Sequence, residues 1–445
     1  MAKRLITNAR VVNNGRISEQ DIFIEDGLIT AVGGDLQHRE ADDIVDAEGL
    51  TLIPGMIDDQ VHFREPGLTH KGDIGTESRA AVAGGITSFM EMPNVNPPTL
   101  SVDALESKFA LAATKSVANY SFYMGASNEN IEAIKQVDPK SVCGVKAFLG
   151  ASTGDLLVDD PDALEAIFQE SPVLVVTHCE DTPTIMAQEA RYRRRYGDDV
   201  PIGYHPNIRS EKACYLSSSM AVALAKKFGT QLQVLHITTA KELALFEPGP
   251  IDNKQITAEV CAHHLFFSKE DYAEKGTLIK CNPAIKRASD RDALLNAVNS
   301  DVIDIIATDH APHTLAEKQN PYFGAPAGLP LVQHALLSVL EHYHRGVFSL
   351  ETIVAKTSHA VAKRFKIPNR GFIEEGFAAD LVLIDLHNST EVKRSDVLYK
   401  CGWSPFEDYT FRSRIHSTIV NGVTVYQQGK LIDSPPIGQR LIFAR

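Results

Sequence analysis

The chain has 445 residues, 44% of them hydrophobic, and a formal net charge of −13 at pH 7. This length indicates a large barrel or two to three units, and the hydrophobic content is enough for a sizeable core. The negative charge argues against nucleic acid or an anionic membrane surface as the main partner. An anionic substrate would need a local cationic pocket.

The N-terminal segment MAKRLITNARVV is charged and then strand-like, without the long apolar core of a signal peptide. No apolar run of about 18 residues occurs in the sequence, so we expect no membrane span. The six cysteines are scattered without CxxC spacing, a pattern typical of reduced thiols in a cytoplasmic protein. For Cys179 and Cys281, buried packing is the expected role.

The first 55 residues consist of short alternating segments separated by NG, DG and GG turns, which predicts β-strands. A similar pattern returns near the other end, in FAADLVLIDL, HSTIVNGVTVYQQGK and RLIFAR. The two ends together predict one small β-sandwich domain, formed by residues 1–55 and 370–445. Residues 56–369 are left for a second domain.

Eight short apolar runs recur through the middle of the chain, and helix-like segments such as DIGTESRAAVAGG, LSVDALESKFALAATKS and SEKACYLSSSMAVALAKKFG separate most of them. In the first of these segments, Gly84 and Gly85 mark the expected helix end. Eight β–α repeats predict a (β/α)8 TIM-like barrel. A doubly wound open sheet is the alternative, but no Gly-rich phosphate loop follows any strand. The runs are GMIDDQVHFR (55–64), SFMEMPN (88–94), YSFYMG (120–125), GVKAFLG (144–150), VLVVTHCE (173–180), QLQVLHIT (231–238), ITAEVCAHH (256–264) and IDIIATDHAPH (303–313).

Polar residues stand at the ends of several predicted strands. Residues two apart on a strand share a face, so the first run would project four polar side chains together: Asp58, Gln60, His62 and Arg64. The C-terminal ends of barrel strands converge on the face where barrel enzymes carry their sites. The side chains expected to meet there are His62, Lys146, His178, His236 and Asp309.

Imidazoles and a carboxylate are ligands of borderline divalent metals such as zinc. An ammonium group beside a cation would be repelled, but burial lowers the pKa of a lysine. The neutral amine of Lys146 could then take up carbon dioxide and become a carbamate that bridges two metals. Two alternatives stay open: Asp155 supplies the bridging oxygen, or Lys146 pairs with a nearby carboxylate.

Seven motifs in this order resemble the amidohydrolase superfamily, and specifically its dihydroorotases: VHFREPG, EMPNVNPPT, GVKAFLG, VVTHCED, VLHITTA, KCNPAIK and ATDHAPH. The resemblance covers nearly the whole chain, including the split β domain through GFAADLVLID. It implies a cytoplasmic enzyme, a homodimer, with one or two zinc ions. The implied reaction is the reversible hydrolysis of dihydroorotate to N-carbamoyl-aspartate in pyrimidine synthesis.

The resemblance also implies roles for single residues. His62 and Asp309 correspond to ligands of the more buried metal, and His178 and His236 to ligands of the second. Lys146 corresponds to the carboxylated (N6-carboxylysine) bridge. Asp309 also corresponds to the general acid–base residue, which takes a proton from the bridging hydroxide and returns it to the ring nitrogen.

Substrate contacts follow from the same resemblance. Arg64 offers a planar fork to a carboxylate, and Asn94, Asn282 and His313 resemble further contacts. Phe323 and Gly324, in NPYFGAPAG, resemble the loop whose backbone contacts the substrate ring. Hydantoinase-like and allantoinase-like relatives, whose rings lack this carboxylate, typically lack an Arg at position 64.

Gln60 departs from the family pattern, in which the first motif usually reads H-x-H. An amide oxygen binds zinc more weakly than an imidazole does, so we expect weaker metal binding at this position. Some dihydroorotase-like chains are non-catalytic partners of aspartate transcarbamoylase. The intact Asp309 and Arg64 favour a working enzyme over such a partner. A hydantoinase- or allantoinase-type cyclic amidase is the third reading of the same motifs.

Overall fold

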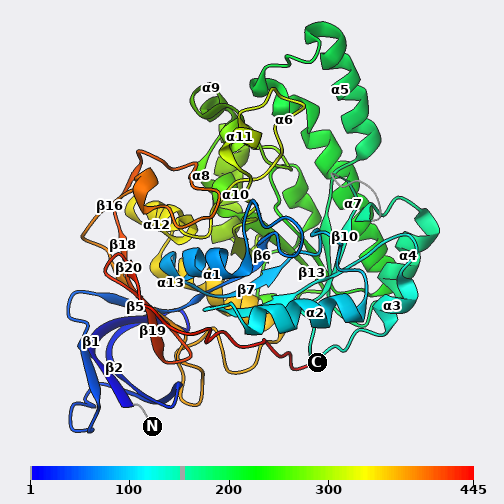
Figure 1. Ribbon diagram of the computed structural model, residues 1–445. Helices are drawn as coiled ribbons and strands as arrows, with labels where there is room; N and C mark the ends of the chain where they lie inside the picture. The colour runs from blue at the N-terminus through cyan, green and yellow to red at the C-terminus, as the bar shows by residue number, and fades with distance from the viewer. Residues whose placement is uncertain (1–2, 151–155) are drawn as a thin grey trace.

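Parallel strands close into a barrel in the computed structural model, which describes residues 3–150 and 156–445 (Figure 1). A three-stranded and a six-stranded parallel sheet form it. β8 and β9 are two parts of one strand interrupted at Tyr123, and Val61 bridges His310 at the other junction. The ring therefore has the eight strand positions predicted from the sequence. The strands are β6 (Met56–Val61), β7 (Ile86–Glu91), β8 (Asn119–Phe122), β9 (Met124–Gly125), β10 (Val145–Phe148), β11 (Val175–His178), β12 (Leu232–Val234), β13 (Ile256–Cys261) and β14 (Ile305–Ala307).

The three helices predicted by sequence pattern form as α1, α2 and α7. Asp73 caps α1 by accepting the Thr76 N–H, and Gly84 caps its end. Gly229 ends α7 in the left-handed conformation, at φ 75°. The helices are α1 (Ile74–Ala83), α2 (Val102–Ala113), α3 (Ile131–Lys135), α4 (Pro161–Glu170), α5 (Thr182–Tyr196), α6 (His205–Ile208), α7 (Glu211–Phe228), α8 (Ala262–Phe266), α9 (Tyr272–Lys275), α10 (Ala288–Asn299), α11 (Leu315–Lys318), α12 (Ala335–His344), α13 (Leu350–Val354) and α14 (Ala360–Phe365). Among the described residues, none of these helices has both the length and the apolar character that a bilayer crossing requires.

Strands from both ends of the chain form one nine-stranded sheet beside the barrel (Figure 1). β5 joins the two contributions, because it pairs with β1 on one side and with β15 on the other. The predicted architecture, a barrel with a small β domain built from both termini, is confirmed. The division of the chain at residues 55 and 370 stays a prediction. The strands are β1 (Lys3–Asn13), β2 (Arg16–Glu25), β3 (Leu28–Gly33), β4 (Asp43–Asp46), β5 (Thr51–Pro54), β15 (Leu381–Asp385), β18 (Arg414–Val420), β19 (Val423–Gln427) and β20 (Lys430–Leu431).

The segment RLIFAR (440–445) does not join this sheet, although its pattern resembles that of the other terminal strands. It returns to the barrel, where the Leu441 N–H donates to Tyr120 O at 2.9 Å. Leu441 and Phe443 are buried in a hydrophobic cluster with Tyr123 and Phe365. Burial of two large apolar side chains explains why the segment packs there rather than at the sheet edge.

Candidate active site

The side chains predicted to bind metal gather at one cavity of about 230 Å³, at the C-terminal ends of the barrel strands. Ten of the sequence-predicted residues line it: Gln60, His62, Arg64, Asn94, Lys146, His178, His236, Asn282, Asp309 and His313. Strand periodicity puts Asp58 on the same face, but Asp58 does not line the cavity. Its carboxylate accepts the Thr308 hydroxyl at 2.6 Å and the Thr308 N–H at 3.1 Å, so it has a structural role.

Three lining residues have left-handed backbone, which is uncommon outside glycine. The φ angles are 71° at Arg64, 41° at His236 and 51° at Asp309. Each residue lies two or three positions after the end of a strand: β6, β12 or β14. Such conformations cost about 1–3 kcal/mol each and concentrate at functional sites, where surrounding structure holds them.

His178 and His236 line the cavity with one ring nitrogen of each directed toward the other. His178 Nδ1 and His236 Nε2 are 2.9 Å apart, and His178 Nε2 lies 2.9 Å from Oε2 of Glu180. Burial raises the pKa of Glu180, but Arg209 and the hydrogen bond from His178 outweigh it and lower that pKa to about 2. Burial lowers the pKa of His178. The neutral His178 therefore donates its Nε2–H to Glu180 and presents a lone pair at Nδ1.

His62 and Asp309 form a second close pair. The His62 Nδ1–H donates to Asn94 Oδ1 at 2.7 Å, which leaves a lone pair at Nε2. That nitrogen lies 3.1 Å from Asp309 Oδ1. Burial lowers the pKa of His62, which favours the neutral ring. An imidazole lone pair and a carboxylate oxygen repel each other at this distance unless a cation lies between them.

The donor set of the cavity therefore fits a divalent metal. Nδ1 of His236 has no hydrogen-bond partner among the described residues, so this nitrogen can carry the ring proton and leave Nε2 free. A cation beside His178 and His236 would then receive two imidazole lone pairs, and one beside His62 and Asp309 a nitrogen and an oxygen. These are ligand types that zinc prefers.

Lys146 reaches the same cavity from β10. Its side chain is 1% exposed, and its ammonium lies 4.7 Å from the centre of the Phe148 ring. Burial lowers the pKa of Lys146 to about 8, which makes the neutral amine accessible near neutral pH. Within residues 3–150 and 156–445, no carboxylate forms an ion pair with Lys146, so the pairing alternative gains no support there. Asp155, the alternative bridging residue, lies outside the described residues.

Arg64 brings a positive charge into the cavity. Its Nε–H donates to Pro312 O at 3.1 Å, and its Nη2 lies 3.1 Å from His313 Nε2. Burial lowers the pKa of Arg64 to about 10, so the guanidinium stays charged at neutral pH. In the described part of the chain, no Asp or Glu oxygen lies within ion-pair distance of it.

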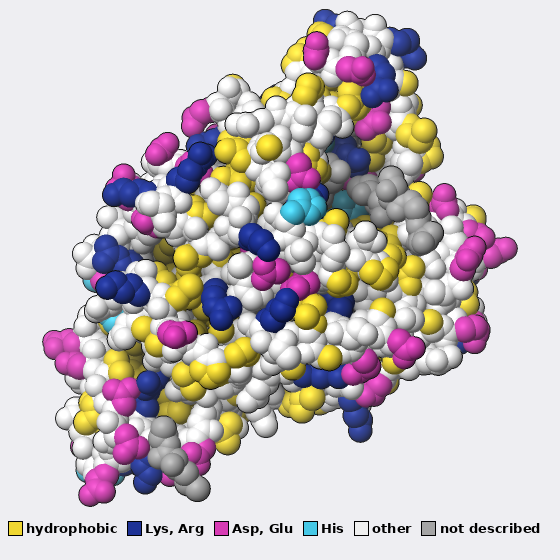
Figure 2. Space-filling model, in the orientation of Figure 1, with side chains coloured by type: hydrophobic (Ala, Val, Ile, Leu, Met, Phe, Trp, Pro, Cys, Tyr) yellow, Lys and Arg dark blue, Asp and Glu magenta, His cyan; other side chains and the backbone are white. Residues whose placement is uncertain are grey.

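His313 is held in one orientation beside Arg64. Its Nδ1 accepts from the ammonium of Lys71 at 3.1 Å, and its Nε2–H donates to Ala327 O at 3.0 Å. Burial, Arg64 and Lys71 lower the pKa of His313 well below its ordinary value, so the ring is neutral. The guanidinium N–H groups of Arg64 are thus available to an anionic ligand. On the face of the molecule that Figure 2 shows, acidic and basic side chains are mixed.

Gln60 lines the cavity with its amide oriented by two neighbours. Nε2 donates to Asp309 Oδ1 at 3.1 Å, and the Oε1 atom lies on the Cys261 side, 3.9 Å from Sγ. Where the family motif has an imidazole lone pair, this chain offers Asp309 a hydrogen-bond donor.

Two of the predicted substrate contacts lie elsewhere. The Phe323 ring packs under the guanidinium of Arg193, 3.9 Å from its Cζ atom, and neither Phe323 nor Gly324 lines the cavity. Ala327 and Gly328 line it from this loop instead. Asn282 does line the cavity, and its Oδ1 has no partner among the described residues. The roles assigned to all the predicted site residues stay predictions.

Known proteins resemble the chain over almost its full length. Residues 51–425 match the Amidohydrolase family. A dihydroorotase of Methanosarcina acetivorans is 32% identical over 98% of this chain and 94% of its own. An allantoinase of Solibacter usitatus is 31% identical over 97% and 95%. The L-hydantoinase (dihydropyrimidinase) of Arthrobacter aurescens has a similar structure, with a TM-score of 0.93 at 26% identity, over 99% of this chain and 100% of that one. This chain belongs to the amidohydrolase family.

As an amidohydrolase with these relatives, the chain is a hydrolase that acts on cyclic amides. The family is generally metal-dependent, in agreement with the donor set of the cavity. The comparisons leave the ring that this amidohydrolase opens undecided among dihydroorotate, allantoin and hydantoin types.

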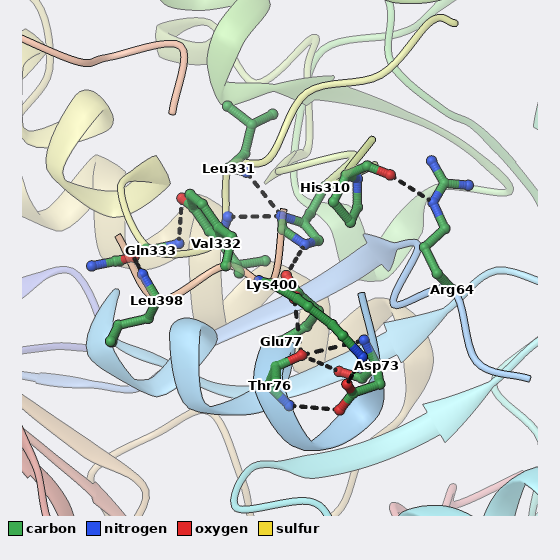
Figure 3. A network of polar contacts seen from close by, with 12 residues as sticks. Arg64, Asp73, Thr76, Glu77, His310, Leu331, Val332, Gln333, Leu398 and Lys400 are labelled. Atoms are coloured by element: carbon green, nitrogen blue, oxygen red, sulfur yellow. Dashed lines mark hydrogen bonds and ion pairs between the residues drawn. The ribbon is translucent and has the colours of Figure 1, made fainter. Parts of the chain in front are cut away.

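A buried pair behind the cavity fixes the residue next to Asp309 (Figure 3). His310 Nδ1 accepts the Leu331 N–H at 2.8 Å, and its Nε2–H donates to Glu77 at 2.8 Å. Glu77 also accepts the Lys400 N–H at 2.9 Å. Both side chains of the pair are fully buried. The pair ties α1, the last barrel strand and the C-terminal segment into one support for Asp309.

The sequence analysis missed the charged residues that orient the side chains of this amidohydrolase site: Lys71, Glu77 and Glu180. The sequence could have identified Glu180, because it stands two residues after His178 and so shares its face if the extended backbone continues. Lys71 and Glu77 follow no strand pattern, since a loop and a helix carry them to the site.

Glu180→Gln should weaken metal binding by about 10- to 100-fold, because the amide no longer holds His178 with a charged acceptor. Competition with a chromogenic chelator measures the affinity. Glu165→Gln, at an exposed position of α4, serves as the control and should leave the affinity unchanged. Equal affinities in the two variants would show that Glu180 does not orient the ligand.

Proposed function

We propose that this amidohydrolase is a zinc-dependent dihydroorotase, which interconverts (S)-dihydroorotate and N-carbamoyl-L-aspartate in pyrimidine biosynthesis. One observation carries the proposal: the buried guanidinium of Arg64 faces the cavity, and no carboxylate of the described residues neutralises it. A buried charge of this kind requires an anionic partner, and the substrate's carboxylate supplies one. The dihydroorotase relatives, at 32% identity, support the same substrate.

Each of the other polar residues in the cavity has its own role in substrate binding. Arg64 pairs with the substrate carboxylate, and its hydrogen bond to Pro312 O holds the guanidinium in place. Lys71 fixes the ring of His313 beside it. Asn94 fixes the His62 tautomer. The unpartnered amide oxygen of Asn282 accepts an N–H of the ring.

His178 and His236 would hold one zinc ion, and His62 and Asp309 a second, with Lys146 carboxylated between them. A bound zinc ion supplies a water of lowered pKa and polarises the carbonyl under attack. Asp309 takes up the proton released in that attack and returns it to the ring nitrogen, as a general acid–base. A homodimer and a cytoplasmic location are part of the proposal through the family resemblance.

The second candidate is a hydantoinase- or allantoinase-type amidase, favoured by the TM-score of 0.93 to an L-hydantoinase. A third is a non-catalytic partner of aspartate transcarbamoylase. Hydantoinases and allantoinases act on rings that lack the carboxylate of dihydroorotate. A non-catalytic partner needs no guanidinium directed at a substrate. Arg64 therefore separates the leading proposal from both.

The purified enzyme, supplied with zinc and bicarbonate, should turn over dihydroorotate faster than hydantoin or allantoin. Arg64→Met should lower kcat/KM for dihydroorotate by about 100-fold, the equivalent of about 2.7 kcal/mol, and should affect the uncharged rings little. The control is Arg79→Met, in α1. Turnover of hydantoin without turnover of dihydroorotate would favour the second candidate, and no turnover of any ring the third.

Asp309→Asn should reduce turnover by about 100-fold or more, because the amide cannot carry the proton. Circular dichroism should show an unchanged fold, and metal analysis should show that the ion beside His178 and His236 is kept. Asp292→Asn, at an exposed position of α10, is the matched control. A near-normal rate in Asp309→Asn would refute its acid–base role.

Gln60→His should increase the zinc retained after dialysis against a chelator, because an imidazole lone pair replaces an amide that donates to Asp309. Elemental analysis of metal per chain measures the effect. Gln319→His adds a histidine at an exposed position and controls for surface binding. If both variants retain as much zinc as the unmodified chain, position 60 lies outside the metal shell.

A further inference from the structure

A second group of metal-ligand side chains lies at the junction of β13 and α8, outside the cavity lining. Cys261 ends β13, and His263 and His264 belong to the first turn of α8. One ligand atom of each residue lies within 4.8 Å of the other two. These residues are 0%, 0% and 3% exposed, so bulk water does not supply hydrogen-bond partners for their polar atoms.

The two histidines have ring nitrogens without partners. Neither nitrogen of His263 has a hydrogen-bond partner among the described residues, nor has Nδ1 of His264. Nε2 of His264 lies 3.1 Å from Pro283 O, so it carries the proton and Nδ1 a lone pair. Buried polar atoms are almost always paired, and an unpaired one costs about 1–3 kcal/mol. A single bound ion would take one of these nitrogens from each ring, so the two adjacent residues point to a bound partner.

Gln60 connects this group to Asp309. Its amide nitrogen donates to Asp309, which turns Oε1 toward the thiol of Cys261, 3.9 Å away. Cys261 Sγ also lies 3.8 Å from Oε1 of Glu259. The group thus offers one sulfur and two imidazole nitrogens, with an amide oxygen at its edge. Sulfur and nitrogen donors in this combination select zinc or a similar thiophilic ion.

We propose that Cys261, His263 and His264 form a structural metal site for a thiophilic cation such as Zn²⁺, separate from the catalytic metal residues. On binding, the thiol of Cys261 loses its proton to solvent, and one metal–sulfur and two metal–nitrogen bonds form. The site would anchor the Cys261 side of Gln60, whose other amide atom holds Asp309.

Cobalt tests the site, because thiolate ligation to Co²⁺ gives an intense charge-transfer absorption and the predicted catalytic ligands contain no sulfur. The full-length enzyme is produced with Co²⁺ in the growth medium, so that the ion is present while the chain folds. The unmodified protein should show this absorption. Cys261→Ala should lose it and bind one ion fewer per chain. Cys143→Ala, at an equally buried thiol in another cluster, should keep both.

Absence of the absorption in the unmodified protein, or its survival in Cys261→Ala, would overturn the proposal. If the sulfur came from Cys281, which lies 3.8 Å from His264 Nε2, the absorption would survive in Cys261→Ala and vanish in Cys281→Ala. Cys261→Ser replaces the alanine variant if circular dichroism shows that the latter is unfolded. The absorption and the ion count are read without measuring turnover, so they test this site separately from the proposed dihydroorotase activity.

Discussion

The closure of the barrel between its first and last strands determines where every functional side chain lies. The His62 N–H donates to His310 O at 2.7 Å, and Val61 bridges the same residue. This junction brings the motif around position 62 against the motif around position 309. Without it, the His62–Asp309 pair and the Arg64–His313 contact could not form, because nearly 250 residues separate the partners.

The closure is reinforced by buried polar groups on both sides. Asp58 is fully buried and binds both the hydroxyl and the N–H of Thr308. Burial raises the pKa of Asp58 to about 8, a sign of how little water reaches the junction. On the outer side, His310 is held by Glu77 and by the N–H of Leu331 (Figure 3). Asp309 lies between these two anchors, and this explains how its left-handed backbone is maintained.

Sequence patterns identified the barrel strands and the residues at their ends, because both follow from strand periodicity and from convergence in a closed ring. They placed Asp58 wrongly, since a side chain on the expected face can still turn to a neighbouring strand. Patterns also missed Lys71 and Glu77, which reach the site from a loop and a helix where no period of two applies. Phe323 lies against Arg193, a contact between distant segments that no local pattern encodes.

The interlaced sheet has a consequence for synthesis on the ribosome. β5 needs β15 as a neighbour, and everything between Pro54 and Leu381 must be translated before β15 exists. At about 5–20 residues per second, the early strands wait for tens of seconds with one edge open. Nascent chains of this enzyme are therefore exposed to edge-to-edge association until β15, at Leu381–Asp385, emerges.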